Sequence, residues 1–146
     1  MNVASNTPRA RKKPSRAQHL LIVDDEPNVL LTLGMIFELD GYTVSKAASC
    51  AEALAMLGNA VHYDAVITDL NMERHDVGLE VARAALRLRP RPVVVICTGY
   101  ADLVNTQAAL DMRVDYFATK PVDLDELKHA IYRLRERNAL AEKLAG

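Results

Sequence analysis

Several polar and charged side chains come directly after short apolar runs of this sequence, and their types suit metal and phosphate chemistry. In open parallel sheets, ligands bind beyond the carboxyl ends of the strands. If the apolar runs are strands of one parallel sheet, the side chains that follow them should meet at one edge. Those side chains are Asp24, Asp25, Asp69, Thr98 and Lys120.

Three carboxylates at one edge would repel one another unless a cation offset their charge. Mg²⁺ prefers oxygen ligands and usually combines one or two carboxylates with phosphate oxygens and water, so we predict a Mg²⁺ site, with Mn²⁺ as the alternative ion. Asp25 and Asp69 are the expected direct ligands, and Asp24 is expected to act through water. The competing interpretation, an acidic patch at a helix N-terminus, accounts for Asp25 but not for Asp69.

Lys120 and Thr98 would complete such a site. The lysine ammonium and the threonine hydroxyl can both stabilise the charge of a phosphoryl oxygen during transfer. With a metal ion beside Asp69 and a cation opposite, the chemistry that fits best is attack of the Asp69 carboxylate on phosphorus, which forms an aspartyl phosphate.

The elements that must position these residues follow from the alternation of apolar runs with stretches of helical period, which is typical of βα units in a parallel sheet covered on both faces. The run at residues 43–47 is the most polar and suits an edge strand. We predict an α/β fold with a doubly wound, five-stranded parallel sheet, flavodoxin-like order 2-1-3-4-5, and five helices. The predicted strands are residues 19–23, 43–47, 65–68, 93–97 and 116–119.

Helix boundaries are marked by capping residues. Pro27 opens the first helix and Gly41 follows its end. Ser49 with Glu52 three positions later predicts a capping box for the second helix. The fifth helix opens at Asp123 as N-cap and runs nearly to the C-terminus. The other predicted helices span about residues 27–40, 50–58, 78–89 and 102–112.

Charge divides the chain unevenly. Residues 1–17 hold five of the 18 basic residues and none of the 19 acidic ones, which leaves 13 against 19, a formal −6, on the remainder. We predict a flexible basic tail at 1–17, one folded domain at 18–137 and an extension of the last helix at 138–146. The tail has no aromatic residue to stack on bases, so a nucleic-acid partner is not expected.

The two cysteines, Cys50 and Cys97, show no metal-ligand spacing and no disulfide framework. Cys97 lies within an apolar run, where a thiol behaves as a small hydrophobe. With no apolar run long enough to cross a bilayer and no secretory signal, we expect a cytoplasmic protein without membrane contact.

Four segments of the sequence resemble the receiver domains of two-component response regulators, typified by the bacterial chemotaxis regulator. The resemblance covers about residues 18–137 and has the motifs in the family's order and spacing. The segments are Leu21-Ile22-Val23-Asp24-Asp25-Glu26-Pro27, Asp69-Leu70-Asn71-Met72, Cys97-Thr98-Gly99-Tyr100-Ala101-Asp102 and Thr119-Lys120-Pro121.

The resemblance implies a role for each matching residue. Asp69 would be the phosphoacceptor, Asp24 and Asp25 the metal pair, and the backbone carbonyl of Asn71 a further metal ligand. Thr98 and Lys120 would bind phosphoryl oxygens, the Lys120-Pro121 bond would be cis, and Phe117 would turn inward as Thr98 moves. The chain departs from the family where Glu73 replaces a proline and Gly78 comes one residue late.

Phosphoryl lifetime is expected to depend on Asn71 and Tyr100, because each lies two residues past a site residue and can flank the path of an attacking water. The expected function is a signalling switch that catalyses only its own phosphorylation and dephosphorylation. A histidine kinase or histidine phosphotransfer protein would donate the phosphoryl group, and a downstream protein would read the face of helix four, strand five and helix five. The apolar seam of the last helix, which continues past the sheet, suggests a homodimer contact or a linker.

Two other functions remain open at this point. One is a phosphohydrolase that uses Asp69 as a transient nucleophile, although such enzymes usually carry an aspartate where Asn71 stands. The other is a degenerate receiver that acts only as a binding scaffold, although the acidic pair, Thr98 and Lys120 are all present.

Overall fold

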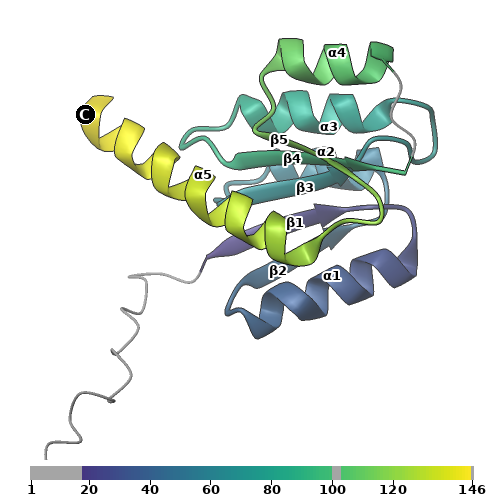
Figure 1. Cartoon of the computed structure of the whole chain (residues 1–146), viewed down its shortest axis with the longest axis horizontal. Coiled ribbons are helices and arrows are strands. Elements are labelled where there is room, and N and C mark those ends of the chain that lie inside the picture. The colour runs from purple at the N-terminus through teal and green to yellow at the C-terminus, as the bar shows by residue number, and fades with distance from the viewer. Residues whose placement is uncertain (1–17, 100–102, 146) are drawn as a thin grey trace, which may run out of the picture.

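The computed structural model describes residues 18–99 and 103–145, which form a parallel five-stranded sheet with helices on both faces (Figure 1). The strand order is β2-β1-β3-β4-β5, which confirms the predicted doubly wound α/β fold. The expected tail at residues 1–17 lies outside the described residues, as does Tyr100. The strands are β1 (His19–Val23), β2 (Thr43–Ala47), β3 (Ala65–Asp69), β4 (Val93–Thr98) and β5 (Tyr116–Thr119).

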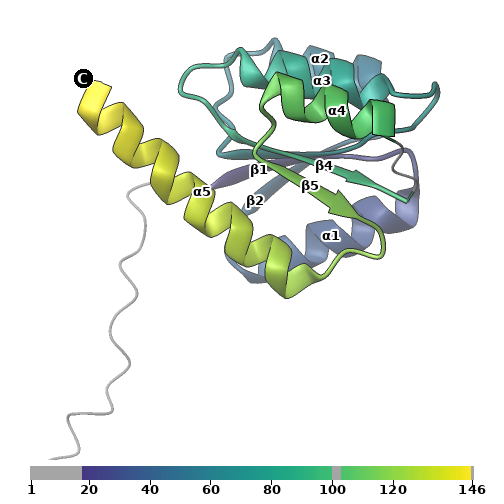
Figure 2. The ribbon, with the colours of Figure 1, turned by 45° about the horizontal axis from the view of Figure 1, so that its top comes forward.

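Two groups of helices cover the two faces of the sheet (Figures 1 and 2). Successive strand residues point to opposite faces, so Leu21 and Val23 pack in one apolar cluster while Leu20 and Ile22 pack in the other. Each face therefore needs its own helical cover. One face is covered by α1 (Pro27–Leu39) and α5 (Leu124–Ala145), and the other by α2 (Cys50–Leu57), α3 (Val77–Leu86) and α4 (Leu103–Met112).

The predicted helix caps are present. Pro27 is the first residue of α1, and Gly41 follows its end with φ +94°, a left-handed conformation that favours glycine. At the start of α2, the Ser49 hydroxyl accepts the Glu52 N–H at 3.1 Å. The Glu52 carboxylate accepts the N–H of Ala48 at 2.8 Å, one residue before the N-cap rather than the N-cap itself. Caps of this kind stabilise a helix by about 1 kcal/mol.

The third helix ends earlier than predicted, at Leu86 instead of residue 89. Arg87 caps it, and Pro90 keeps Arg89 out of helical geometry. The Arg89 guanidinium turns back and donates to the carbonyls of Leu86 and Leu88 at 2.9 and 2.7 Å. A longer helix could not pair these carbonyls, because the residues four positions further on, Pro90 and Pro92, have no N–H.

The last helix, α5, continues beyond the sheet, as the sequence predicts (Figure 1). Leu127 and Ile131 are fully buried against the sheet. Asn138 is half-buried, while Leu140 and Leu144, one turn apart, are 58% and 80% exposed. Within the described residues, none of the helices has the length and apolar character needed to span a membrane.

Candidate phosphorylation site

The predicted site residues gather at the carboxyl edge of the sheet, where the strand arrowheads of Figure 1 end. Asp69 and Thr98 are the last residues of β3 and β4, so each strand is one residue longer than predicted. Asp24 and Asp25 follow β1 directly, and Lys120 follows β5. One carboxylate oxygen from each of the three aspartates lies within 4.8 Å of the others.

Asp24 is a buried carboxylate with partners on both oxygens. Its Oδ1 accepts the N–H of Glu26 at 2.9 Å, and its Oδ2 accepts a hydrogen bond from the Lys120 ammonium at 2.9 Å. Such charge-assisted bonds are about twice as strong as neutral ones. Asp24 therefore holds both the turn into α1 and the head of Lys120.

Asp69 lies under the same lysine and is only 7% exposed. Burial raises the pKa of Asp69 to about 6, against the opposing effect of the Lys120 charge, with further elevation from the charges of Asp24 and Asp25. The Lys120 ammonium stands 3.7 Å from the Asp69 Oδ2. In the free protein the Asp69 carboxylate is thus costly to ionise, because burial removes it from water and the Lys120 charge offsets this cost only in part.

Lys120 is held at the end of β5 by its backbone, whose N–H donates to the Thr98 carbonyl at 2.7 Å. Burial alone would lower the pKa of Lys120, but the hydrogen bond to Asp24 and the charges of Asp69 and Asp24 raise it overall. The side chain is therefore a permanent cation. The Lys120-Pro121 bond is cis, as the sequence predicts.

The donor set fits a hard divalent cation. All three side chains offer carboxylate oxygens, and Asp25 is exposed to an incoming ion. The raised pKa of Asp69 means that a further positive charge beside it would favour its ionised form. Asp24, Asp25 and Asp69 are the residues that would hold the ion. The Asn71 carbonyl, the fourth predicted ligand, follows β3 by two residues and remains a prediction.

Thr98 and Phe117, the predicted switch pair, occupy neighbouring strands. Thr98 is buried at the end of β4 and pairs in register with Thr119. Phe117 is half-buried and packs on the α2–α3–α4 side of the sheet, against the cluster that contains Ile96. Tyr116 packs on the opposite side, as the alternation of strand residues predicts.

The loop between β3 and α3 contains a contact that the sequence alone did not predict. Glu73, which takes the position of the family's proline, accepts the backbone N–H of Cys50 at 2.9 Å. Its carboxylate therefore caps the first turn of α2, where a negative charge is favourable. The Asn71 side-chain oxygen accepts the Asp76 N–H at 2.8 Å, and Asp76 adopts φ 63° just before α3.

Gly78 explains how the lengthened loop closes on the site. A Cβ at this position would lie 2.0 Å from the Asp69 carbonyl oxygen and 2.7 Å from the Leu70 Cα, distances that no side chain tolerates. The Gly78 N–H donates to the Leu70 carbonyl at 2.7 Å. The start of α3 therefore lies directly on the backbone of Asp69, and only glycine permits that approach.

An apolar cavity of about 340 Å³ adjoins Asp69 and Lys120 on the α1 side. Its walls include Val29 and Leu33 of α1, and Cys97 lies at the sheet. Burial raises the pKa of Cys97 to about 12, so this thiol stays protonated near neutral pH. This apolar surrounding contributes to the desolvation of Asp69.

Comparison with known proteins identifies the family. The response regulator receiver domain model matches residues 20–132. The chain is 39% identical over 123 residues to the transcriptional regulatory protein GlrR of Escherichia coli K12, covering 84% of this chain and 27% of GlrR. It is 34% identical over 125 residues to the TorCAD operon transcriptional regulatory protein TorR of the same strain, covering 86% and 53%. The chain thus spans about a quarter to a half of the length of these relatives.

Two solved structures are also similar. A CheY-like response regulator receiver domain from Methanospirillum hungatei JF-1 has a TM-score of 0.80 and 29% identity, and the match covers 86% of this chain and 99% of that one. A response regulator protein from Burkholderia pseudomallei, with a phosphorylated aspartic acid, a calcium ion and citrate, has a TM-score of 0.72 and 25% identity, with 88% and 75% covered.

The expectation that nucleic acid plays no part is not supported by the relatives, which are transcriptional regulatory proteins by name. The expected resemblance, by contrast, is confirmed by the family match and by the fold. The chain belongs to the receiver domains of two-component response regulators, which are signalling domains.

Proposed function

We propose that this chain is a phosphorylation-operated switch in which Asp69 accepts a phosphoryl group from a histidine kinase or a histidine phosphotransfer protein. One observation carries the assignment. The buried Asp69 carboxylate lies within 4.8 Å of the Asp24 and Asp25 carboxylates and 3.7 Å from the Lys120 ammonium. A carboxylate so placed is a nucleophile with a cation on one side and metal ligands on the other.

In this proposal an ionised Asp69 oxygen forms the new bond to phosphorus, while the bond from phosphorus to the donor nitrogen or oxygen breaks and the donor keeps that electron pair. Mg²⁺, when bound, supplies positive charge beside the phosphoryl oxygens. Lys120 moves from its bond with Asp24 toward the new phosphoryl oxygen, and the Thr98 hydroxyl donates to another. The rest of the protein needs only to hold these groups in place.

The response to phosphorylation would pass from Thr98 to Phe117, whose half-buried ring would turn further inward. The face of α4, β5 and α5 would then present a changed surface to a downstream protein. Leu103, Val104 and Tyr132 support this assignment, since they are 83%, 75% and 59% exposed on that side of the molecule.

The lifetime of the phosphoryl group would be set by Asn71 and Tyr100. The Asn71 side chain already braces the β3–α3 loop through Asp76, so its replacement would loosen the loop as well as open a path for water. Tyr100→Ala is expected to shorten the half-life of the phosphoprotein. An unchanged rate of dephosphorylation would remove Tyr100 from this role.

The experiment that tests the proposal is incubation with acetyl phosphate and Mg²⁺, followed by measurement of the intact protein mass. The wild-type chain should gain one phosphoryl mass, and the gain should disappear with EDTA and in Asp69→Asn. Asp125→Asn is the matched control, because it removes the same charge from an exposed position on α5. A phosphoryl gain in Asp69→Asn at the wild-type rate would refute the assignment.

A further inference from the structure

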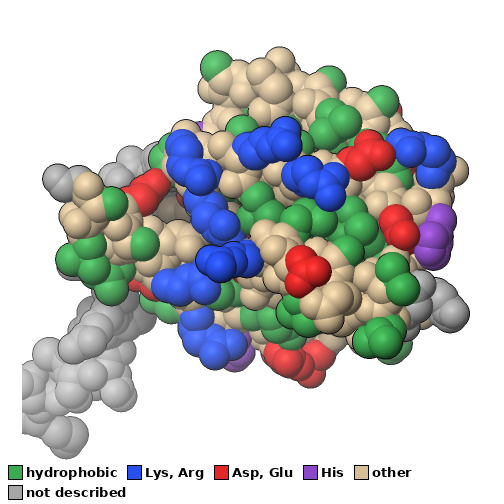
Figure 3. All heavy atoms as spheres, turned by 90° about the horizontal axis from the view of Figure 1, so that it is seen from above, with side chains coloured by type: hydrophobic (Ala, Val, Ile, Leu, Met, Phe, Trp, Pro, Cys, Tyr) green, Lys and Arg blue, Asp and Glu red, His purple; other side chains and the backbone are tan. Residues whose placement is uncertain are grey.

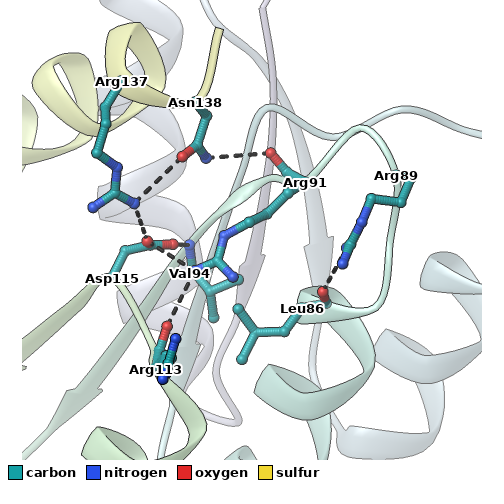
Figure 4. A network of polar contacts seen from close by, with 8 residues as sticks. All are labelled: Leu86, Arg89, Arg91, Val94, Arg113, Asp115, Arg137 and Asn138. Atoms are coloured by element: carbon teal, nitrogen blue, oxygen red, sulfur yellow. Dashed lines mark hydrogen bonds and ion pairs between the residues drawn. The ribbon is translucent and has the colours of Figure 1, made fainter. Parts of the chain in front are cut away.

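The amino-terminal edge of the sheet, opposite the phosphorylation site, contains a buried carboxylate shared by two arginines (Figure 4). The Asp115 side chain is 2% exposed and accepts the N–H of Val94 at 2.8 Å. Its other oxygen accepts from Arg91 at 2.9 Å and from Arg137 at 2.6 Å. One carboxylate therefore binds two guanidinium groups, and the cluster of Asp115, Arg91 and Arg137 keeps a net positive charge.

Neighbouring bonds fix the backbone around these arginines. Arg91 donates to the Arg113 carbonyl at 3.1 Å, and Asn138 donates to the Arg91 carbonyl at 3.3 Å. Arg89 is held by the end of α3 (Figure 4). Arginines from the loop before β4, the loop before β5 and helix α5 are thereby brought together at one edge.

Further arginines extend this group into a band. Figure 3 shows Lys and Arg side chains in a column on one face, with the carboxylates in that view lying to either side. Arg133 lies one turn before Arg137 on α5, and Arg83 and Arg87 lie one turn apart at the end of α3. We call the set the arginine band: Arg83, Arg87, Arg89, Arg91, Arg113, Arg133 and Arg137.

The arginine band is positively charged, whereas the domain as a whole has a negative net charge. Residues 18–146 carry 13 basic and 19 acidic residues, a formal −6, yet seven of the basic ones lie in this band. All seven are arginines, whose planar forks bind phosphate oxygens in pairs. A surface of this kind attracts anions locally although the chain as a whole does not.

The shape of the band selects the kind of anion. Exposed guanidiniums in a column suit the repeated phosphates of a nucleic-acid backbone, whereas a single small anion would need them to converge in a cavity. The side chains of the band offer charge and paired donors for phosphates rather than aromatic platforms for bases, which favours a duplex over a single strand.

The first residue that the structure describes, Gln18, lines a pocket of about 250 Å³ with Arg91, Arg135 and Asn138. The acidic residues Asp64, Glu136 and Glu142 line the same pocket, so this pocket adds no net positive charge to the band. The sequence before Gln18 holds five basic residues and no acidic one, so it is a separate candidate for binding anions.

We propose that the arginine band is a docking surface for the phosphate backbone of duplex DNA, bound without regard to sequence. The surface lies at the opposite edge of the sheet from Asp69, so it is separate from the phosphoryl-transfer site and does not depend on the proposed function. The domain could then bind DNA through the arginine band while the opposite edge, with Asp69, remains accessible to a kinase.

The test is fluorescence anisotropy with the full chain, a labelled duplex of about 25 base pairs and a series of salt concentrations. Binding is expected with Kd of about 10⁻⁶ to 10⁻⁴ M near physiological salt. Arg113→Gln with Arg133→Gln should weaken it about tenfold and reduce the slope of log K against log salt by about 2, since each phosphate contact contributes about 0.9. Both side chains are exposed, and neither belongs to the Asp115 ion pairs.

The matched control is Lys46→Gln with Lys128→Gln, which changes the net charge equally but lies outside the band. It should leave the affinity within about twofold. Circular dichroism and labelling by acetyl phosphate should be unchanged in both double variants, which separates a failure here from a failure of the proposed function.

Five outcomes would overturn the proposal. Four of them are an absence of binding to the duplex, an equal loss in the control variant, tighter binding to a single strand of the same length, and equal competition by polyglutamate. The basic segment provides a further arm. If binding survives in the band variant but is lost when the five tail residues become glutamine, the tail alone binds DNA and the band does not; those residues are Arg9, Arg11, Lys12, Lys13 and Arg16.

Discussion

Replacing Asp69 with asparagine should make the metal-free protein more stable. Burial raises the pKa of Asp69 from 3.8 to about 6, so folding favours the protonated carboxyl group. The stability that this group contributes is complete below about pH 4 and is lost as the pH rises through 6. At pH 7.5 the ionised carboxylate therefore opposes folding.

The size of the effect follows from the shift. About two pKa units correspond to about 3 kcal/mol, at 1.36 kcal/mol for each unit. Asparagine has nearly the same shape and no charge, so the replacement removes the buried charge with little change in packing. Asp69→Asn should accordingly raise the free energy of unfolding by about 1–3 kcal/mol at pH 7.5, and by much less at pH 4.

Urea unfolding followed by circular dichroism, at both pH values and in EDTA, measures this difference. Mg²⁺ should stabilise the wild type by binding only the folded state, and should stabilise Asp69→Asn less. Asp111→Asn, on the exposed side of α4, is the control and should change stability by less than about 0.5 kcal/mol. If Asp69→Asn is no more stable than the wild type at pH 7.5, or gains equally at pH 4, the reasoning fails.

Three further results are expected. Gly78→Ala should cost about 2–4 kcal/mol in urea unfolding and slow phosphorylation, because its Cβ meets the Asp69 carbonyl; Gly58→Ala, whose nearest contact is 3.4 Å, should cost far less. Asp115→Ala should lower the free energy of unfolding by about 1–3 kcal/mol, because the buried Val94 N–H loses its acceptor and Arg91 loses its carboxylate partner, and an unchanged free energy would contradict this. In sedimentation, wild type with Mg²⁺ and a phosphoryl mimic should shift toward dimer and Leu140→Glu should not; a strictly monomeric wild type would argue against the α5 contact.

The sequence predicts the strands almost to the residue, since five apolar runs between well-marked helices leave few alternatives. Its errors lie at element ends. The strands that carry Asp69 and Thr98 are each one residue longer than predicted. The reason is that the last residue of each still pairs with a neighbouring strand: Asp69 pairs with Cys97, and Thr98 pairs with Thr119. The third helix stops early at Leu86, since Pro90 and Pro92 lack the N–H groups that its next turn would need, and the Arg89 guanidinium donates to the carbonyls of Leu86 and Leu88 instead.

The site was predictable as far as its residues follow strands, because parallel strands bring their carboxyl ends to one edge. The contacts that support it were not. Glu73 reaches Cys50 across 23 residues, and Gly78 is required only because α3 lies on the backbone of Asp69. Such pairs depend on how elements pack, and a single sequence carries no signal for them.

The way α5 is fastened makes it a lever arm. Its 22 residues span about 33 Å, and its last bond to the sheet edge is that of Asn138 with the Arg91 carbonyl. Among the residues that the structure describes, none bonds the turns after Asn138, with Leu140 and Leu144, to the sheet. A tilt of about 5° at the β5 end would move the far end of the helix by about 3 Å, so a shift too small to repack the core can still reposition whatever is attached there.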